Sequence, residues 1–509
     1  MKKIIYKISG VVLMFSMMLS SCTKDFQEIN TDPNNTLNAL PQQLLAPALV
    51  SSLSYNMIRN RSFNNELMQV SVDLSDADGK VFRYDYRSNW ADYLYNGWYS
   101  ELTNFKDIYK IASEELTYNR SYMGISLICQ SWIYSLLTDT YGDVPYFKSN
   151  MARDSSIYEP AFTSQKEIYL DIFKQLEAAD TLLETKTGIV PTSDPVYNGD
   201  IKKWQKFGNS LYLRLLLRLS GKAEVSQEVI AKIQEIINNP TDYPIMTSND
   251  ESAILKWTGV APYTSPFISV REQDFRGVSI ASFFIDNLVV WNDPRIDLAY
   301  ATGSPTKTNR WAIAPYQGAF LGVPSGYSPG DNPIKKSYFY STSNNNGSGP
   351  TLMTEPLAGM IMNYAEVQFI LAEAASKGWI GGSEEAYYNQ GVESSIKLWL
   401  PNWPVAVTDY LAAADMQWDG AATLEAKMEK IHLQKYYALF LNDLQQWFEY
   451  RRTGHPVLPV GAGLRNNGVM PARMTYPVYV QSTNPTNYKA AVAAQGPDVI
   501  STQVWWQKP

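Results

Sequence analysis

The stretch SQKEIYLDIFKQLEAADTLL, residues 164–183, decides the fold class of this chain. Ser164 and Glu167 stand three residues apart at its start, which is the capping box that opens many helices. The apolar side chains that follow recur with a period near 3.6, so they share one helix face that a core can bury; they are Ile168, Ile172, Leu176, Ala179 and Leu183. The stretch therefore predicts an amphipathic helix over residues 165–183.

Similar helical patterns lie on both sides of this stretch. We expect helices over residues 98–116, 122–137, 204–219 and 229–237. Nearer the C-terminus, residues 363–377 form a periodic segment that stops at Gly378, a residue suited to the left-handed helix cap. Ser383, followed by Glu384 and Glu385, predicts the start of the next helix.

A longer helix is predicted from about residue 424, with a stripe of apolar residues that should face a core; they are Leu433, Tyr437, Phe440, Leu444 and Trp447. Pairs of such helices with short connections are typical of tetratricopeptide repeats, although no segment matches that consensus closely. We therefore predict a mostly α-helical fold, a scaffold of tetratricopeptide-like helix pairs that carries one long loop-rich insertion.

That insertion covers residues 240–360 and holds 12 of the 28 prolines, together with the polar run STSNNNGSGP at residues 341–350. Proline at this density excludes long helices. Aromatic residues in such loops either pack the loops onto the scaffold or present flat faces to a ligand, and both interpretations stay open here. The candidates for ligand contact are Trp257, Tyr263, Trp311, Tyr316 and Tyr327, with a second group of Tyr84, Tyr86 and Trp90.

The N-terminus has the order of a lipoprotein signal peptide. Lys2, Lys3 and Lys7 form a basic region, an apolar run follows over residues 11–19, and Leu19-Ser-Ser-Cys22 forms a lipobox. The run is about half of the roughly 20 apolar residues that a membrane-spanning helix needs. We therefore expect a signal peptide at residues 1–21, a lipidated tether at 22–41 and a single domain at 42–509. An ordinary cleaved signal that happens to precede a cysteine is the alternative.

The first prediction is that Cys22 is the acylated N-terminus of the mature chain. Mass spectrometry of protein extracted from membranes should find diacylglyceryl on Cys22. An unmodified N-terminus upstream of Cys22 would contradict this prediction.

Cysteine content and charge limit the other functions. With Cys22 acylated, Cys129 has no partner for an intramolecular disulfide, and its apolar surroundings favour a buried side chain. Removal of residues 1–21 leaves 40 basic and 50 acidic side chains, because the segment contains three lysines and no acid. This acidic balance argues against nucleic acid as a partner, since binding a polyanion needs a basic surface.

Most catalytic motifs are missing from the sequence. The chain has only two histidines, His432 and His455, so a zinc site or a Ser/His/Asp triad has little to build on. His455 lies in a turn after a predicted helix, where a structural role is expected. No GxSxG, HExxH or P-loop motif occurs. We predict no enzyme activity, no catalytic residues and no metal or cofactor, although paired carboxylates for a glycosidase cannot be judged from sequence.

One acidic loop partly resembles a calcium-binding loop. Asp73, Asp76 and Asp78 precede Gly79 in a pattern similar to a calcium loop, but Leu74 stands where an EF-hand needs its first carboxylate. An EF-hand is therefore excluded, while a more loosely bound calcium ion stays open.

Several short motifs together resemble one known family along the whole chain. They are the lipobox with Cys22-Thr-Lys-Asp-Phe26, Asn30-Thr-Asp-Pro-Asn34, Asp139-Thr-Tyr-Gly-Asp-Val-Pro-Tyr146, Asn292-Asp-Pro-Arg295, Tyr364-Ala-Glu-Val-Gln-Phe-Ile-Leu-Ala-Glu373 with Gly378-Trp379, Gln446-Trp447 leading to Arg451-Arg452-Thr453-Gly454, and Asn484-Pro-Thr-Asn-Tyr488. In order and spacing the chain resembles the SusD/RagB-type nutrient-binding outer-membrane lipoproteins of the Bacteroidetes.

The resemblance implies a scaffold with four tetratricopeptide-like pairs that packs against a SusC-like TonB-dependent outer-membrane barrel and acts as its lid. It also implies a loop-rich face that binds oligosaccharides or other nutrients, and a lipid anchor that holds the protein at the cell outer membrane. Lys24-Asp25 with Glu28 only partly resembles the acidic signal for export to the outer face. The ligand residues of the family are not part of its shared motifs, so none is carried over.

The residue patterns and the family resemblance together leave three classes of function open. The first is a surface lipoprotein that binds nutrients and delivers them to the transporter. The others are a cell-surface glycoside hydrolase, which needs only carboxylates, and a structural or adhesive lipoprotein. An adhesin would be expected to show β-rich repeats, which the helical patterns here do not.

Overall fold

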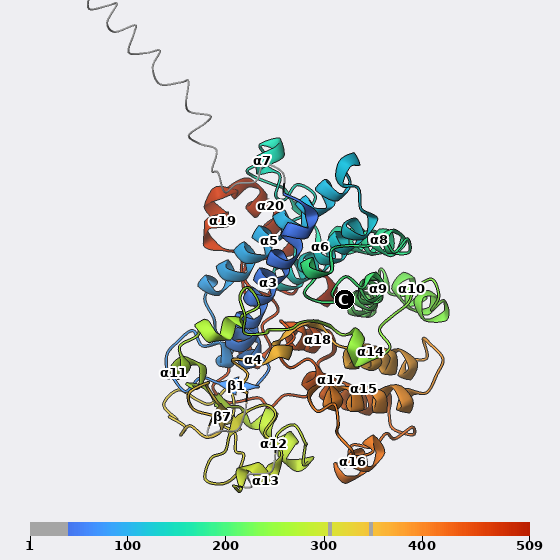
Figure 1. The fold of residues 1–509 in the computed structure, drawn as a ribbon. Coiled ribbons are helices and arrows are strands. Elements are labelled where there is room, and N and C mark those ends of the chain that lie inside the picture. The colour runs from blue at the N-terminus through green and yellow to red at the C-terminus, as the bar shows by residue number, and fades with distance from the viewer. Residues whose placement is uncertain (1–38, 304–307, 346–349, 509) are drawn as a thin grey trace, which may run out of the picture. The chain divides into compact units, whose positions relative to one another are not determined.

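The computed structural model describes residues 39–303, 308–345 and 350–508. The predicted signal peptide and nearly all of the predicted tether, with Cys22, therefore lie outside the described residues. The chain from Pro41 to Pro509 forms one compact unit, and it is mostly helical (Figure 1). Among the described residues, no helix is both long and apolar enough to cross a bilayer.

The helices of this unit run along the whole chain and are labelled in Figure 1. They are α3 (Pro41–Arg59), α4 (Asn65–Leu67), α5 (Ala91–Ala112), α6 (Arg120–Tyr141), α7 (Ala152–Ser155), α8 (Gln165–Leu183), α9 (Ile201–Leu219), α10 (Ser226–Asn238), α11 (Glu272–Phe275), α12 (Ser282–Val290), α13 (Leu298–Ala301), α14 (Tyr364–Ser376), α15 (Glu384–Trp399), α16 (Val407–Ala413), α17 (Leu424–Ala438), α18 (Gln445–Thr453), α19 (Val478–Thr483) and α20 (Pro485–Gln495).

The strands are short and occur in four antiparallel pairs. The pairs are β1 (Ser71–Val72) with β5 (Ser279–Ile280), β2 (Val144–Pro145) with β3 (Phe162–Thr163), β4 (Ala253–Leu255) with β8 (Gly359–Met362), and β6 (Ile313–Ala314) with β7 (Tyr338–Phe339). Three of these pairs involve residues 240–360, so the strands hold the loops of the insertion to one another and to the scaffold.

Helix α8 shows why the helical scaffold forms. The Ser164 side chain accepts from the Glu167 backbone N–H and the Glu167 side chain accepts from the Ser164 backbone N–H, which completes the predicted capping box. The predicted apolar face is buried, with exposed fractions of 2% or less from Ile168 to Leu183. This face packs on α6 and α9. The helix predicted over 165–183 is confirmed with both of its ends.

Helix hairpins continue through the scaffold. Consecutive helices α5 and α6, α9 and α10, and α14 and α15 pack on one another, while α14 also contacts α9 and α17. In Figure 1 α5 and α6 lie in the upper part of the unit, α9 and α10 lie at mid-height on the right, and α14, α15 and α17 lie below them. Helix α14 ends before Gly378, which takes a φ of 69°, and α15 begins after the predicted cap Ser383. The predicted mostly α-helical fold is confirmed.

The helix predicted from residue 424 is wrong in one respect, because it is two helices. The chain between α17 and α18 turns through residues with positive φ, namely Leu441 at 69° and Asp443 at 30°. Asn60 donates to the Asp443 carbonyl at 2.7 Å, and Asn64 accepts from the backbone N–H of Trp447 at 3.2 Å. Contacts from a distant segment therefore stabilise a break that the local periodicity does not show.

Candidate ligand-binding site

Five of the eight aromatic candidates lie in the core. The exposed fractions of their side chains are 3% for Tyr84, 6% for Tyr86, 1% for Trp257, 0% for Trp311 and 8% for Tyr327. The Trp311 ring lies 5.7 Å from the Phe284 ring and 5.0 Å from the Phe440 ring, measured between centroids. These five rings pack loops onto the scaffold, so in this structure they offer no open face to a ligand.

The Tyr327 ring illustrates how a loop aromatic becomes buried. It stacks on Phe82 at 5.0 Å, and the Arg83 guanidinium lies 4.8 Å from its centroid. Its backbone carbonyl accepts from Nε of Arg83 at 3.1 Å. The loop of residues 325–331 is thereby fastened to the segment after β1, which the sequence alone does not place beside it.

The other three candidates, Trp90, Tyr263 and Tyr316, are partly exposed. Tyr263 closes a tight turn by donating its backbone N–H to the Val260 carbonyl at 2.8 Å. Tyr316 pairs with Ala319 in another turn. In the described part of the chain no hydrogen bond or ring contact joins these three aromatics. Ligand contact by Trp90, Tyr263 and Tyr316 stays a prediction.

Trp90 belongs to a group that we call the Trp90 cluster, made of Tyr55, Arg59, Trp90 and Tyr93. The Arg59 guanidinium, at the end of α3, lies 4.8 Å from the Trp90 ring and 4.6 Å from the Tyr93 ring. Tyr55 meets Tyr93 edge to face at 5.1 Å. All four side chains are partly exposed. Flat aromatic rings can stack on a sugar ring, and a guanidinium beside them can donate hydrogen bonds to the sugar hydroxyls.

The Arg59 side chain is partly exposed, and its Nε is among its buried atoms. Burial lowers its pKa, while Tyr93 and Tyr141 act in the opposite direction. Its Nε makes no hydrogen bond to any described residue. Sequence reasoning missed Tyr55, Arg59 and Tyr93. The spacing of Tyr55 from Arg59 and of Trp90 from Tyr93 places each pair on one helix face, which is the signal that could have found them.

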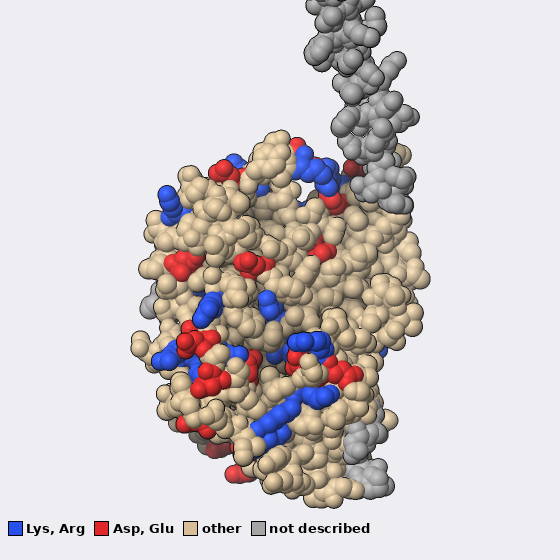
Figure 2. All heavy atoms as spheres, turned by 90° about the vertical axis from the view of Figure 1, so that its left-hand side faces the viewer, with Lys and Arg blue, Asp and Glu red and all other residues tan. Residues whose placement is uncertain are grey.

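The face of the unit that carries α3 and α5 has no strong field of one charge. Figure 2 looks onto this side and shows Lys and Arg side chains next to Asp and Glu, with broad uncharged areas between them. Such a mixed surface suits a neutral ligand better than a polyanion.

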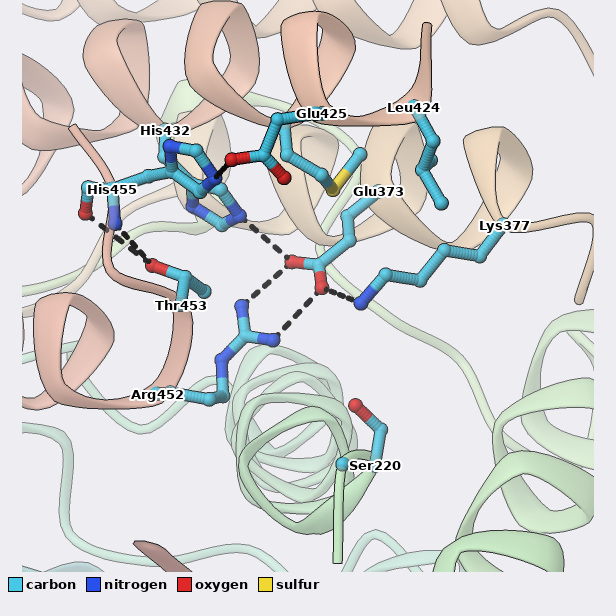
Figure 3. A pocket seen from close by; sticks show the side chains of 11 residues that line it. Ser220, Glu373, Lys377, Leu424, Glu425, His432, Arg452, Thr453 and His455 are labelled. Carbon is cyan, nitrogen blue, oxygen red and sulfur yellow. Dashed lines mark hydrogen bonds and ion pairs between the residues drawn. The ribbon is translucent and has the colours of Figure 1, made fainter. Parts of the chain in front are cut away.

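A charged pocket of about 400 Å³ lies between the ends of α14, α17 and α18. Figure 3 shows the Glu373 carboxylate at its centre. Arg452 binds this carboxylate through both oxygens at 2.8 and 2.6 Å, and Lys377 binds it at 2.6 Å. Nε2 of His432 lies 3.3 Å from it. His455 lines the same pocket and contacts Glu429 at 2.6 Å through Nδ1.

Glu373 of this pocket and Glu449 next to it do not suit the role of a glycosidase acid. Oxygen atoms of Glu373 and Glu449 come within 4.8 Å of each other, near the spacing of about 5–5.5 Å in retaining glycosidases. Burial is the largest single influence and would raise the pKa of each, but the cations around each carboxylate together outweigh it. They are Arg452 and Lys377 at Glu373, and Arg452, Lys435 and Arg218 at Glu449. Both pKa values are held well below the ordinary range, whereas a general acid needs a raised pKa.

A metal ion also fits these donors poorly. Glu373, His432 and Glu449 could each offer one ligand atom. However, Arg452 bridges both carboxylates, and Lys435 donates to Glu449 at 2.7 Å. A divalent cation would have to displace these charged donors. The arrangement is that of a buried ion-pair network that joins α14, α17 and α18.

The carboxylates of the acidic loop before Gly79 likewise pair with basic side chains. Asp73 pairs with Lys80 at 2.6 Å, and Asp76 pairs with Arg83 at 2.8 Å while accepting from the Gly330 backbone N–H at 2.9 Å. These contacts occupy carboxylate oxygens that a calcium ion would need. A loosely bound calcium ion at this loop stays a hypothesis.

Residues 33–477 match the family model SusD-like 2, described as starch-binding and associating with the outer membrane. No curated protein matches the chain.

Solved structures share the fold over nearly the whole length. A SusD homologue from Bacteroides fragilis NCTC 9343 is 24% identical with a TM-score of 0.75, over 92% of this chain and 100% of its own. A chitin-binding protein is 25% identical with a TM-score of 0.73, over 93% and 100%. A chitin-binding SusD homologue from Flavobacterium johnsoniae is 21% identical with a TM-score of 0.74, over 92% and 98%.

The family match covers most of the chain, and the helices from α3 to α18 lie within it. The resemblance inferred from the short motifs is therefore confirmed, and the chain belongs to the SusD-like family of starch-binding proteins that associate with the outer membrane.

Proposed function

We propose that this protein is a lipid-anchored lipoprotein of the cell outer membrane that binds a nutrient, most simply an oligosaccharide, and delivers it to a SusC-like TonB-dependent transporter without cleaving it. The observation that carries the proposal is the family match over residues 33–477. Two solved relatives whose names say that they bind chitin support a saccharide ligand. The lowered pKa values of Glu373 and Glu449 argue against these two carboxylates as the general acid of a glycoside hydrolase.

Modest affinity is expected for such a protein. Each aromatic face that covers about 100 Å² of a sugar gains about 2.5 kcal/mol before the costs of association. Two or three such faces, after loss of translational and rotational freedom, leave a Kd of the order of micromolar to millimolar. This affinity suits a lid that captures a ligand and releases it to a transporter.

The second prediction concerns Trp90 as a ligand platform. Replacement of Trp90 by alanine should weaken saccharide binding by about 1–3 kcal/mol, because the cluster loses its largest partly exposed ring. Calorimetric titration with a bound oligosaccharide measures the effect. Tyr158→Ala serves as the matched control, since Tyr158 is 75% exposed and is not among the candidates for ligand contact. Equal affinities for wild type and Trp90→Ala would show that the ligand binds elsewhere.

The third prediction concerns the transporter. Extraction in mild detergent and pull-down on a C-terminal tag should recover a barrel protein in roughly stoichiometric amount, because a lid needs a large contact with its transporter. A Cys22→Ala variant, expected to lose the lipid anchor, controls for capture that depends only on the membrane. Repeated recovery of the lipoprotein alone would refute delivery to a barrel.

A further inference from the structure

A second pocket, of about 360 Å³, lies among α5, α6, α8 and the segment after β2. It shares no lining residue with the Trp90 cluster or the charged pocket. The three helices pack side by side in the upper part of Figure 1. Because the pocket is built on rigid helices that belong to the scaffold, the side chains that line it are held in place without the loops of residues 240–360.

One wall of this pocket is aromatic. The Tyr134 and Tyr146 rings lie 4.4 Å apart, and Phe147 meets Tyr146 edge to face at 5.0 Å. Tyr109 completes the wall. Phe147 is 58% exposed although it is large and apolar. An exposed phenyl ring that lines a pocket is a surface on which a ligand can stack.

Oxygen acceptors also line this pocket. Oδ2 of Asp171 accepts from the Tyr146 hydroxyl at 2.8 Å and from Nε2 of Gln175 at 3.2 Å. These bonds hold the Asp171 carboxylate in place, while its Oδ1 receives no hydrogen bond from a described residue. Gln130 donates through Nε2 to Ser126 at 2.9 Å, which leaves its carbonyl oxygen as a further acceptor.

Hydrogen-bond donors also line this pocket. Nζ of Lys106 donates to the carbonyl and the hydroxyl of Ser149 at 2.9 and 3.0 Å, and no acidic side chain of the described chain pairs with it. Burial lowers the pKa of Lys106 to about 8, so the amine is mostly charged at neutral pH. Ser131 lines the pocket with a side chain that is buried, at 2% exposure, and its hydroxyl has no hydrogen-bond partner among the described residues.

This combination selects a class of ligand. An inorganic anion would be repelled by Asp171, and a purely apolar ligand would leave Oδ1 of Asp171 and the Ser131 hydroxyl without a hydrogen bond. A polyhydroxylated ring both donates and accepts, and it presents apolar C–H faces to aromatic side chains. We propose that this pocket is a second saccharide-binding site, in which a sugar ring stacks on Phe147 and donates hydroxyl protons to Asp171.

The size of the pocket narrows the ligand further. Its volume lies at the lower end of the range of about 300–1,000 Å³ for small-molecule sites, which suits a mono- or disaccharide rather than a long chain. The proposal takes its ligand class from the proposed function and adds a site on the helical scaffold. A protein with two separate saccharide sites could hold one oligosaccharide at two points or two ligands at once.

The test uses the mature protein in a Trp90→Ala background, so that binding at the Trp90 cluster does not mask the pocket. Calorimetric titration with maltose and with chitobiose should show saturable binding of one of them. Phe147→Ala and Asp171→Asn, each added to this background, should weaken that binding about tenfold or more. Tyr158→Ala is the matched control, because Tyr158 is 75% exposed and does not line the pocket.

The outcomes separate this proposal from the proposed function. Because Phe147 is exposed, its removal should leave the thermal midpoint nearly unchanged, so weaker binding reports on the pocket itself. If Trp90→Ala alone abolishes saccharide binding, or if both pocket variants bind as well as their background, the pocket proposal is overturned and the proposed function stands. If the wild type binds neither sugar, the pocket proposal is also overturned, and recovery of the barrel alone decides the proposed function.

Discussion

Trp311→Ala is expected to lower the free energy of unfolding by about 3–5 kcal/mol, the range for removing a buried aromatic side chain from a core. Trp311 is fully buried and lies against Phe284, Phe440 and Trp399. The Arg295 guanidinium also lies 4.7 Å from its ring, held there by the buried carboxylate of Asp293. Removal of the indole would open a cavity beneath the loops and leave the charged pair without its aromatic neighbour.

Urea denaturation of the wild type and the variant measures this effect. Tyr316→Ala is the control, because Tyr316 lies five residues further along the same segment and is partly exposed. Saccharide affinity measured on the folded variant gives a second readout. Nearly unchanged stability combined with weakened binding would mean that Trp311 is a ligand platform after all, against the packing that the structure shows.

The second large effect is expected at the ion pair between Arg214 and Glu366. Arg214→Met should destabilise the protein by about 3–5 kcal/mol, because it leaves the Glu366 carboxylate buried without a counter-ion. Both side chains are 2% exposed or less. Nε and Nη2 of Arg214 bind the two carboxylate oxygens at 2.7 and 2.6 Å, and Nη2 also donates to the Ile361 carbonyl at 3.1 Å. The pair connects α9 to the start of α14.

The double variant Arg214→Met with Glu366→Met provides the matched control. It removes both charges and keeps much of the volume, so it should recover most of the stability that the single variant loses. Urea denaturation of the wild type, both single variants and the double variant forms a complete cycle. If Arg214→Met is as stable as the wild type, the ion pair is not what joins these two helices.

Local sequence information predicted the scaffold well. The capping box of Ser164 and Glu167 and the apolar face down to Leu183 lie within one helix, so the sequence of that helix contains everything that its prediction needs. The break between α17 and α18 could not be predicted in this way. It depends on Asn60 and Asn64, which are more than 370 residues away along the chain and donate to or accept from the turn.

The candidate sites were predicted less well for the same physical reason. Pro- and Gly-rich loops predicted exposed rings, but Trp311 is fully buried against Phe284 and Phe440. Arg59 and Trp90 come from different helical segments, and Lys106, Phe147 and Asp171 meet only because α5, α6 and α8 pack together. A residue type and its neighbours in sequence do not determine whether a ring faces a ligand or the core.

The central claim is that the protein captures a saccharide without cleaving it. A titration with oligosaccharides, followed by an assay for cleavage of the same oligosaccharides, tests this claim most directly. The mature wild-type protein is titrated with a panel of starch- and chitin-derived oligosaccharides, and each mixture is assayed afterwards for new reducing ends. We expect saturable binding of at least one oligosaccharide with a Kd of the order of micromolar to millimolar, and no new reducing ends. Growth of reducing ends with time, or the absence of binding to every member of the panel, would contradict a protein that captures saccharides without cleaving them.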